Sequence, residues 1–150
     1  MIQFLPIDID ERNNEKFSGH PECEPILAVF TEHYKKVGYE LPWVAYFIAD
    51  EGGELIGGGG FKGAPVNGKV EISYGTFDKQ QGRGIATEIC RELTDLALRT
   101  DPSVTVTART LPDNHASIRV LEKNNFVNQG PVMDVDDGEV FEFVYIQRHK

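Results

Sequence analysis

The sequence has too few cysteines and too few long apolar runs for several common classes of protein. Its two cysteines, Cys23 and Cys90, have a spacing that fits neither a metal site nor a disulfide framework, so both are predicted to be free thiols. No apolar run reaches the roughly 18 residues of a membrane-spanning helix. The first residues also lack the basic segment and hydrophobic core of a signal peptide. We therefore expect no membrane span and a cytoplasmic protein.

Basic residues are also scarce. The chain has 15 lysines and arginines against 24 aspartates and glutamates, which gives a formal net charge of −9 at pH 7. Nucleic-acid phosphates are held by clustered lysine and arginine, and here these residues are scattered along the chain. The composition thus argues against a nucleic-acid partner and is more compatible with a basic substrate.

Glycine, in contrast, is abundant, and one glycine-rich stretch organises the chain. The hexapeptide Gln81-Gly82-Arg83-Gly84-Ile85-Ala86 lies between a strand-like run and a strongly amphipathic helical pattern. Gly82 and Gly84 have no Cβ, so they allow backbone amides to face a ligand. The helix N-terminus adds free N–H groups and a partial positive charge, which favour a phosphate, and Arg83 adds a mobile cation.

Two familiar phosphate loops do not fit this stretch. A Walker A loop needs a lysine followed by Ser or Thr, and the sequence contains no such pair. A dinucleotide fingerprint would need a third glycine at the position of Thr87. The spacing does match Q/R-x-x-G-x-G/A, with Gln81, Gly84 and Ala86 at the defined positions. Taken alone, the hexapeptide is compatible with a phosphate cradle, with an ordinary turn, and with a nucleotide-binding module.

A second motif follows about thirty residues later. Residues 114–126 read N-H-A-S-I-R-V-L-E-K-N-N-F, which is similar to N-x-x-[AS]-x-x-x-x-x-K-x-G-F with Asn125 where glycine is usual. Together the two ordered motifs resemble those of the GNAT superfamily of acyl-CoA N-acyltransferases. The second is particularly similar to the subgroup that includes the ribosomal-protein N-terminal acetyltransferases. The resemblance covers residues 44–130 well and the N-terminal residues poorly.

This resemblance implies an α/β (α+β) fold of GNAT type, with a mixed, mostly antiparallel central sheet of about six or seven strands flanked by helices. It implies a single N-acetyltransferase domain over residues 1–150, which uses acetyl-CoA as cosubstrate and works as a monomer or homodimer. The expected reaction moves an acetyl group to a primary amine (a protein N-terminus, a polyamine or a small amine) by direct attack in a ternary complex. The alternative is a non-catalytic acyl-CoA-binding sensor or scaffold.

Hydrophobic periodicity and turn residues predict the elements around the two motifs. Residues 8–24 are polar and turn-rich. The strand before the glycine-rich loop and the strand after its helix should pair in parallel, because a helix connects them. Strands are expected at 2–7, 44–49, 54–61, 69–77, 103–109, 126–132 and 139–147, and helices at 25–37, from 85 to about 99, and after Asp113 or Asn114 as the cap.

Two features leave alternatives open. Gly57 to Gly60 are four consecutive glycines in a predicted strand. Either something approaches this backbone closely or the strand bends, or the run marks a simple bulge. Trp43 is the only tryptophan, and it could contact a substrate or plug the core.

A general base is expected, because an amine must lose its proton before it attacks a thioester. Glu71 is the best candidate, since alternation along the strand places Glu71 and Ser73 on one face and Ile72 and Tyr74 on the other. The alternative for Glu71 is an ordinary strand carboxylate that faces solvent or pairs with a lysine. A backbone N–H at a splayed strand end could stabilise the oxyanion, although splay is not visible in a sequence.

The leaving thiolate is where the chain departs from the resemblance. Many relatives have a tyrosine seven residues after the motif asparagine, and this chain has Leu121 there. Ser117 and Tyr74 are the substitute donors, so the predicted catalytic residues are Glu71, Ser117 and Tyr74. By resemblance, the loop holds pyrophosphate, the strand backbone pairs with pantetheine, and Asn114 contacts pantetheine or caps a helix. The predicted acetyl-CoA-binding residues are Tyr74, Gly75, Thr76, Gln81, Gly82, Arg83, Gly84, Ile85, Ala86, Asn114 and Ser117; no metal ligand is predicted.

Overall fold

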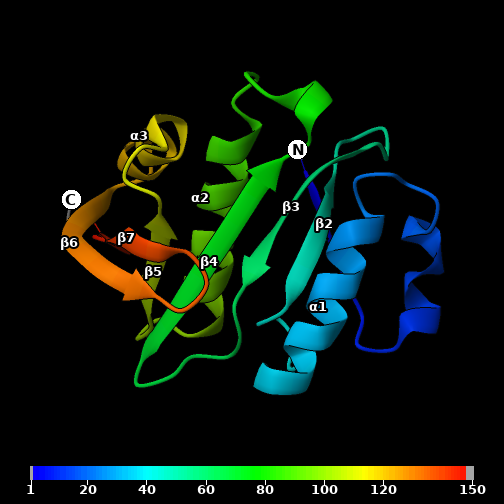
Figure 1. The fold of residues 1–150 in the computed structure, drawn as a ribbon, viewed down its shortest axis with the longest axis horizontal. Helices are drawn as coiled ribbons and strands as arrows, with labels where there is room; N and C mark the ends of the chain where they lie inside the picture. The colour runs from blue at the N-terminus through cyan, green and yellow to red at the C-terminus, as the bar shows by residue number, and fades with distance from the viewer. Residues whose placement is uncertain (1, 148–150) are drawn as a thin grey trace.

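Residues 2–147 are described by a computed structural model, in which one sheet is flanked by helices (Figure 1). The elements match the predicted strands and helices to within a few residues. The strands are β1 (Gln3–Pro6), β2 (Ala45–Ala49), β3 (Leu55–Phe61), β4 (Lys69–Thr76), β5 (Thr105–Thr110), β6 (Phe126–Asp134) and β7 (Gly138–Tyr145). The helices are α1 (Glu24–Val37), α2 (Ile85–Thr100) and α3 (His115–Lys123), with the short 3₁₀ helices η1 (Glu11–Phe17) and η2 (Asp78–Gln80).

The sheet has seven strands in the order β1-β2-β3-β4-β5-β7-β6. Within the described residues, β4 and β5 are the one parallel pair, and α2 is the crossover between them. This confirms the predicted mixed, mostly antiparallel sheet. Figure 1 shows α1 in front of β2 and β3, and α2 behind β4 on the opposite face. Among the described residues, no helix is both long and apolar enough to cross a membrane.

The core lies on both faces of the sheet and includes Trp43. This side chain is 6% exposed, and its ring meets Phe61 edge-on with 5.1 Å between the ring centroids. Trp43 is therefore a core residue, which decides between the two alternatives. Tyr34 on α1 ties the sheet to the helix, because its hydroxyl donates to the Ile7 carbonyl at 2.8 Å and accepts from the Ala45 N–H at 3.0 Å.

Packing restricts some of the four glycines of β3 but not all of them. A Cβ on Gly57 would come within 2.4 Å of the Gly75 carbonyl, and one on Gly60 within 2.5 Å of the Val44 carbonyl. Neighbouring backbone thus approaches these two closely. A Cβ on Gly58 would meet only ordinary contacts, the nearest 3.5 Å away at the Tyr46 carbonyl. A bulge is present as well, because the register between β2 and β3 shifts next to this run of glycines.

Two asparagines shape the ends of α3. Asn114 is its N-cap, and its side-chain oxygen accepts from the Ser117 N–H at 3.1 Å. Asn125 has a φ of 67°, in the left-handed region where asparagine is among the better-tolerated residues after glycine. This explains how asparagine can replace the glycine of the motif. Leu121, between them, is fully buried and belongs to the core.

The segment before α1 contains structure that its polar composition did not predict. Residues 11–17 form η1, which begins after Asp10, whose carboxylate accepts from the Arg12 N–H. Phe17 is buried, and its ring lies 4.6 Å from that of Phe47 between centroids. One buried aromatic residue thus anchors an otherwise polar segment to the sheet.

Each edge of the sheet carries a proline. β1 is a four-residue edge strand that ends at Pro6. β6 forms the other edge, and its register with β7 shifts between Asn128 and Pro131, with Gly130 at a φ of 103°. This shift is a β-bulge, which bends and twists the edge strand.

Candidate active site

The sheet opens where β4 ends. β4 and β5 pair from Lys69 with Thr105 to Ile72 with Ala108, and within the described residues their pairing ends there. β4 nevertheless continues to Thr76 and β5 to Thr110. The last residues of β4 therefore border a gap between two parallel strands, which is the splay that the sequence could not reveal.

The register decides which backbone groups face this gap. The Lys62 N–H donates to the Glu71 carbonyl, and the Phe77 N–H donates to the Ile56 carbonyl. Because hydrogen-bonding direction alternates along a strand, the odd-numbered residues of β4, Gly75 among them, point their peptide groups at β3. The peptide groups of Tyr74 and Thr76 point toward the gap. Of the three residues predicted to pair with pantetheine, these two have the required direction and Gly75 does not.

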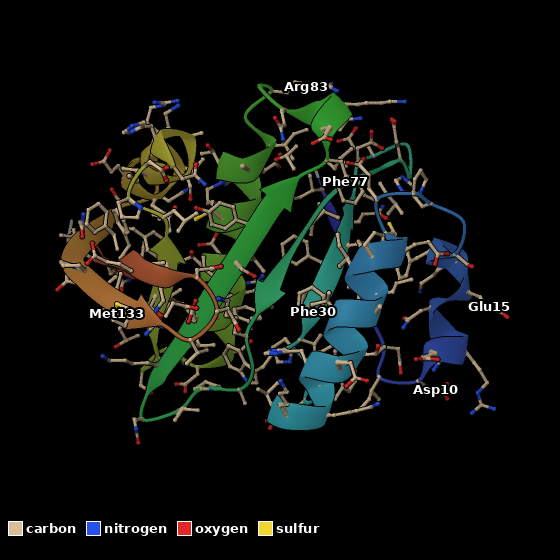
Figure 2. All side chains as sticks on the ribbon, viewed as in Figure 1. Asp10, Glu15, Phe30, Phe77, Arg83 and Met133 are labelled. Carbon is tan, nitrogen blue, oxygen red and sulfur yellow. The ribbon has the colours of Figure 1, made fainter. Side chains whose placement is uncertain are left out.

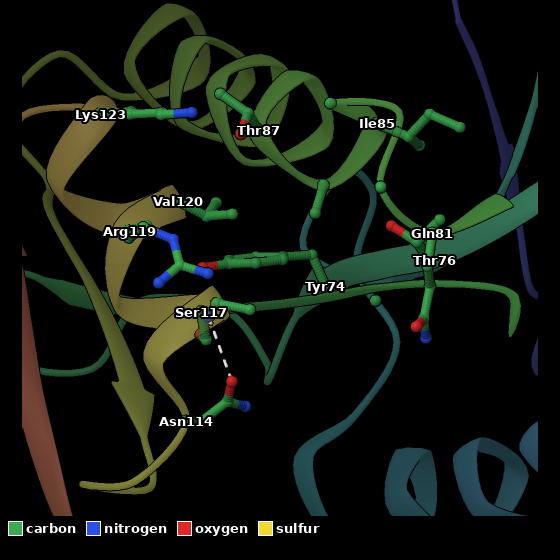
Figure 3. Close-up of a pocket in the computed structure, with 15 residues that line it drawn as sticks. Tyr74, Thr76, Gln81, Ile85, Thr87, Asn114, Ser117, Arg119, Val120 and Lys123 are labelled. Carbon is green, nitrogen blue, oxygen red and sulfur yellow. Dashed lines mark hydrogen bonds between the residues drawn. The ribbon is translucent and has the colours of Figure 1, made fainter.

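A cleft of about 610 Å³ occupies the gap and extends to α2 and α3; we call it the α3 cleft (Figure 3). It brings together the end of β4, the glycine-rich loop, and the exposed side of α3. Every predicted acetyl-CoA-binding residue except Arg83 lines it. The lining residues are Tyr74, Gly75, Thr76, Gln81, Gly82, Gly84, Ile85, Ala86, Thr87, Asn114, Ala116, Ser117, Arg119, Val120 and Lys123.

The loop has the backbone geometry of an anion cradle. Gly82 and Gly84 have φ values of 82° and 75°, which glycine adopts without strain. Gly84 is the N-cap of α2 and has no side chain to cap the helix, so the first amides of α2 are left for another acceptor. Ile85, Ala86 and Thr87 all line the α3 cleft. The cleft therefore offers uncapped helix amides to a phosphate.

The cations that line the α3 cleft are not the predicted Arg83. Arg83 lies at the outer end of the loop, away from the α3 cleft, where its Nη1 donates to the Gln80 side chain at 2.7 Å (Figure 2). Arg119 and Lys123 of α3 line the cleft instead. The sequence held a signal for them, because Ala116, Arg119 and Lys123 follow the i, i+3, i+7 spacing of one helix face.

Tyr74 reaches across the cleft toward α3, and its ring lies beside Ser117 and Arg119 (Figure 3). Its buried hydroxyl makes no aligned hydrogen bond among the described residues, although Ser117 and Cys90 lie near it. Burial, and then the neighbouring Cys90, raise the pKa of Tyr74, while Ser117 acts in the opposite direction. The phenol is therefore protonated at neutral pH. Burial also raises the pKa of the Cys90 thiol to about 12, so Cys90 is a packed, un-ionised residue.

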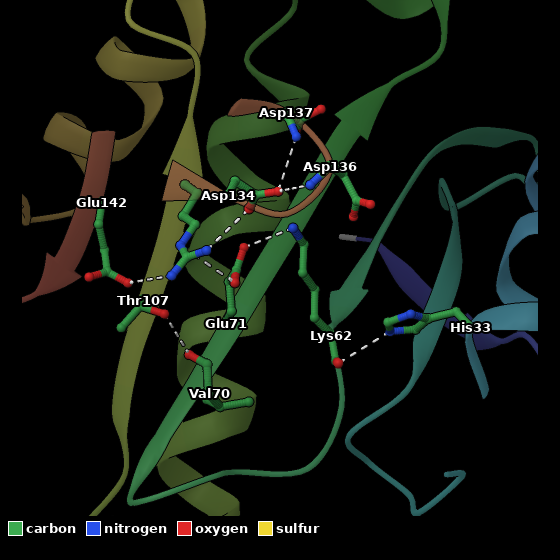
Figure 4. A network of polar contacts seen from close by, with 10 residues as sticks. His33, Lys62, Val70, Glu71, Thr107, Asp134, Asp136, Asp137 and Glu142 are labelled. Carbon is green, nitrogen blue, oxygen red and sulfur yellow. Dashed lines mark hydrogen bonds and ion pairs between the residues drawn. The ribbon is translucent and has the colours of Figure 1, made fainter. Parts of the chain in front are cut away.

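Glu71 is not a free carboxylate. Its Oε2 lies 2.8 Å from Lys62 Nζ, and its Oε1 lies 4.0 Å from Arg109 Nε (Figure 4). Arg109 also meets Asp134 at 3.2 Å and Glu142 at 3.6 Å. Burial opposes the charged guanidinium, but the hydrogen bond to Asp134 and the neighbouring carboxylates raise the Arg109 pKa above its usual value. Glu71 thus sits between two cations on the face of β4 opposite the α3 cleft.

A second hollow, of about 280 Å³, lies on that opposite face, between α1 and the ends of β3 and β4. We call it the α1 hollow. It shares Tyr74, Gly75 and Thr76 with the α3 cleft, so the two spaces meet at the end of β4. Figure 2 shows Phe30 on the side of α1 that faces this strand end, with Phe77 just beyond β4. The lining residues are Ile26, Phe30, Tyr46, Gly58, Gly59, Ser73, Tyr74, Gly75, Thr76 and Phe77.

Comparison with known proteins agrees with this geometry. Residues 8–127 match the family described as "Acetyltransferase (GNAT) domain". The chain is 33% identical over 116 residues to an uncharacterized N-acetyltransferase, YjdG, of Bacillus subtilis (strain 168). That alignment covers 77% of this chain and 66% of the relative, so the chain spans just under two thirds of its length.

Three solved structures are similar over much of the chain. A spermidine N-acetyltransferase chimera from Vibrio cholerae SpeG and hSSAT has a TM-score of 0.71 at 15% identity, over 97% of this chain and 95% of that one. RimL, a ribosomal L7/L12 α-N-protein acetyltransferase in complex with coenzyme A, has a TM-score of 0.69 at 17% identity, over 97% and 93%.

The third is an aminoglycoside acetyltransferase, AAC(6')-Ib, also in complex with coenzyme A, with a TM-score of 0.58 at 26% identity over 67% of this chain and 64% of that one. Together with the family match over most of the sequence, the motifs and the opened sheet lead to one assignment. The chain belongs to the GNAT family of N-acetyltransferase domains.

Proposed function

We propose that this protein transfers an acetyl group from acetyl-CoA to a primary amine by direct attack within a ternary complex. One observation carries the proposal. The α3 cleft and the α1 hollow lie on opposite faces of the sheet and meet at Tyr74, Gly75 and Thr76, where β4 has lost its β5 partner. A donor on one side and an acceptor on the other can therefore meet at a strand end with free peptide groups.

The α3 cleft suits a coenzyme A ester. The uncapped amides after Gly84 would hold the pyrophosphate, assisted by Arg119 and Lys123 instead of Arg83. The inward peptide groups of Tyr74 and Thr76 would pair with the amide groups of pantetheine. One of these N–H groups would also face the oxyanion that forms at the thioester carbon. The substrate supplies the activated acetyl group.

Two proton transfers remain: the amine must lose a proton, and the leaving sulfur must gain one. The neutral amine forms a C–N bond to the acetyl carbon, and the C–S bond of the thioester breaks. Nitrogen loses one proton and the leaving thiolate gains one, so CoA leaves as a thiol. A phenol holds its proton more tightly than a thiol, whose ordinary pKa is about 8.5. Tyr74 would therefore donate a hydrogen bond to the departing sulfur, and Ser117 is the second donor within the cleft.

The role of Glu71 as base depends on Lys62. Lys62 Nζ occupies Oε2 of Glu71 at 2.8 Å, so an acceptor amine would reach this oxygen only when Lys62 moves away. The same ion pair favours the second candidate function, acyl-CoA binding without turnover. In that case the α3 cleft binds its ligand and the α1 hollow has no catalytic role.

Two measurements separate these functions. Calorimetric titration with acetyl-CoA, CoA and ATP tests the α3 cleft, and binding of ATP alone would contradict an acyltransferase. Thiol release over a panel of amines and peptides then distinguishes turnover from binding. We expect acetyl-CoA to bind and at least one amine class to release CoA; binding without release from any amine would establish the sensor.

A further inference from the structure

We propose that the α1 hollow selects an acceptor whose amine carries a compact apolar group, and that it excludes acceptors with a second charge at that end. This inference rests on the proposed function and names its substrate class. The shared chemistry is a primary amine beside an alkyl or aryl group. Such a group could belong to a free monoamine or to the first residue of a peptide.

The lining of the hollow gives the first argument. No charged residue lines it in the described part of the chain, and the side chains over its floor include Ile26, Phe30 and Phe77. The polar side chains of the lining are uncharged hydroxyls, such as those of Ser73 and Thr76, so an ammonium placed there loses hydration without gaining a carboxylate partner, which is costly. An alkyl or aryl group gains from the same burial. Polarity therefore favours a monoamine over a diamine.

The surrounding carboxylates do not reverse this preference. Glu71, on the same face of β4, is already paired with Lys62 at 2.8 Å. Asp134 is paired with Arg109 at 3.2 Å. At the Phe77 end, the Glu22 carboxylate accepts from the Asp78 N–H at 3.2 Å. None of these carboxylates lines the α1 hollow, so a second ammonium inside it would face no carboxylate on the walls of the hollow.

The size of the hollow gives the second argument. Its volume of about 280 Å³ is just below the roughly 300–1,000 Å³ typical of pockets for drug-sized ligands. It can thus receive one side-chain-sized group next to the amine. Bulkier substituents would have to remain outside.

The floor of the hollow gives the third argument, which is independent of polarity. Gly58 and Gly75 are cross-strand neighbours there. Neither has a positive φ, a Cβ on Gly75 would meet nothing within 4 Å, and one on Gly58 would meet only ordinary contacts. Packing thus requires glycine at Gly57 and Gly60 but not at these two positions. Glycine in a strand interior costs stability, and here its effect is to keep the floor open.

Matched amines test the preference directly. Hexylamine and hexamethylenediamine have the same six-carbon chain and differ only at the far carbon, which carries hydrogen in the first and an ammonium group in the second. We expect kcat/KM for hexylamine to exceed that for the diamine by at least about tenfold, with phenethylamine also preferred. Peptides that begin with leucine or serine form the second arm. Higher kcat/KM for the leucine peptide than for any free amine would assign the source to a protein N-terminus.

A matched pair of variants tests the floor. Gly58→Ala should lower kcat/KM for hexylamine by about tenfold or more, because one extra methyl in an apolar pocket has effects of about 10–200-fold. Affinity for acetyl-CoA should stay within about twofold, and stability should not fall. Gly52→Ala, in the β2–β3 turn and far from both spaces, is the control and should leave all three unchanged.

Binding measured without turnover tests the acceptor preference separately from the proposed acetyl transfer. Hexylamine and the diamine are each titrated into protein saturated with CoA, which cannot donate an acetyl group. Tighter binding of hexylamine, lost in Gly58→Ala, supports the inference even if no amine is acetylated and the proposed function fails. Equal or tighter binding of the diamine, or equal loss for both amines in Gly58→Ala, overturns the inference while thiol release still supports acetyl transfer.

Discussion

The two spaces at the end of β4 are built in different ways. The α3 cleft takes its loop from one contiguous segment, and it presents uncapped helix amides and two cations. The α1 hollow is assembled from α1, β2, β3 and β4, and it presents apolar side chains over small residues. The proposed phosphate cradle is thus a local arrangement of backbone groups, whereas the cations from α3 and the whole of the α1 hollow depend on long-range packing. Changes in the two should therefore separate donor affinity from acceptor choice.

The largest effect is expected from Gly84→Val on the donor side. Gly84 has a φ of 75°, and a β-branched residue there is strained, so the loop should move and its amides should no longer converge. We expect the Kd for acetyl-CoA to rise about 100-fold, which corresponds to ~2.7 kcal/mol, in a calorimetric titration.

A control variant with similar backbone strain separates the effect on the glycine-rich loop from a general loss of stability. Gly53 has a φ of 88° in the β2–β3 turn, and a Cβ there would also meet nothing within 4 Å. Gly53→Val should lose similar stability without any change in Kd. A folded Gly84→Val protein with normal affinity would remove the loop from the donor site.

Tyr74→Phe tests the group that reaches from the shared strand end into the cleft. Loss of the hydroxyl should lower kcat about 10- to 100-fold, at or below the lower end of the effect of one proton-transfer group, with little change in Kd for acetyl-CoA. Ser117→Ala should have a smaller effect on the same steady-state rate. If Ser117→Ala costs more than Tyr74→Phe, the serine is the principal donor to the sulfur.

Leu121→Tyr restores the residue that many relatives have, but at a fully buried position. An extra ring in a packed core should lower the free energy of unfolding by ~1–3 kcal/mol. For a chain of this size, the melting temperature should fall by roughly 2–4 °C for each kcal/mol. A rise in kcat without loss of stability would show that the new phenol reaches the cleft.

On the opposite face of β4, Lys62→Gln should raise kcat a few-fold at neutral pH if Glu71 is the base, because the lysine no longer occupies Oε2 of the carboxylate. Glu71→Gln should lower kcat most at neutral pH and progressively less as pH nears the pKa of the acceptor amine. These pH–rate profiles need to be measured on both variants and on the double variant. An additive double variant would show that the two side chains do not act through their ion pair.

The smallest effect concerns Asp134 at the tip of the β6–β7 hairpin. The Asp136 N–H and the Arg109 guanidinium, working against burial, lower the pKa of Asp134 below its usual value. The stabilisation is therefore present above an ordinary aspartate pKa of about 3.9 and is lost as pH falls through the lower folded value. Asp134→Asn should flatten the fall in stability below about pH 4 in denaturant titrations. An identical pH dependence in both proteins would exclude this contribution.

Much of the fold could be predicted because its signals are local. The alternation in β4, the glycine loop, the stripe on α2 and the cap at Asn114 each lie within one short segment, and the order strand–helix–strand dictated the parallel pair. η1 was missed because two buried residues hold it in place: Phe17, which packs on Phe47, and Asn14, whose side chain hydrogen-bonds the Asp8 backbone. Propensity says little about such a segment.

The site was predictable to the same extent. The loop glycines line the cleft, as their motif predicted, but Arg83 turns to Gln80 in the preceding short helix, and the partners of Glu71 come from other segments of the chain. The need for glycine at Gly57 and Gly60 likewise depends on backbone from neighbouring segments. Spacing along a chain can indicate which residues share a face, but not which cation lies opposite a carboxylate.

The two edges of the sheet have a consequence for how the protein behaves at high concentration. An unpaired strand edge is a template for another copy of the chain, and stacking of such edges leads to aggregates. Here β1 is short and ends at Pro6, and β6 is interrupted by the bulge before Pro131. Proline supplies no N–H for a ladder, so a second chain could extend this sheet only with gaps. The exposed Met133 and Val135 near the end of β6 are thereby displayed on an edge that resists growth into a fibril.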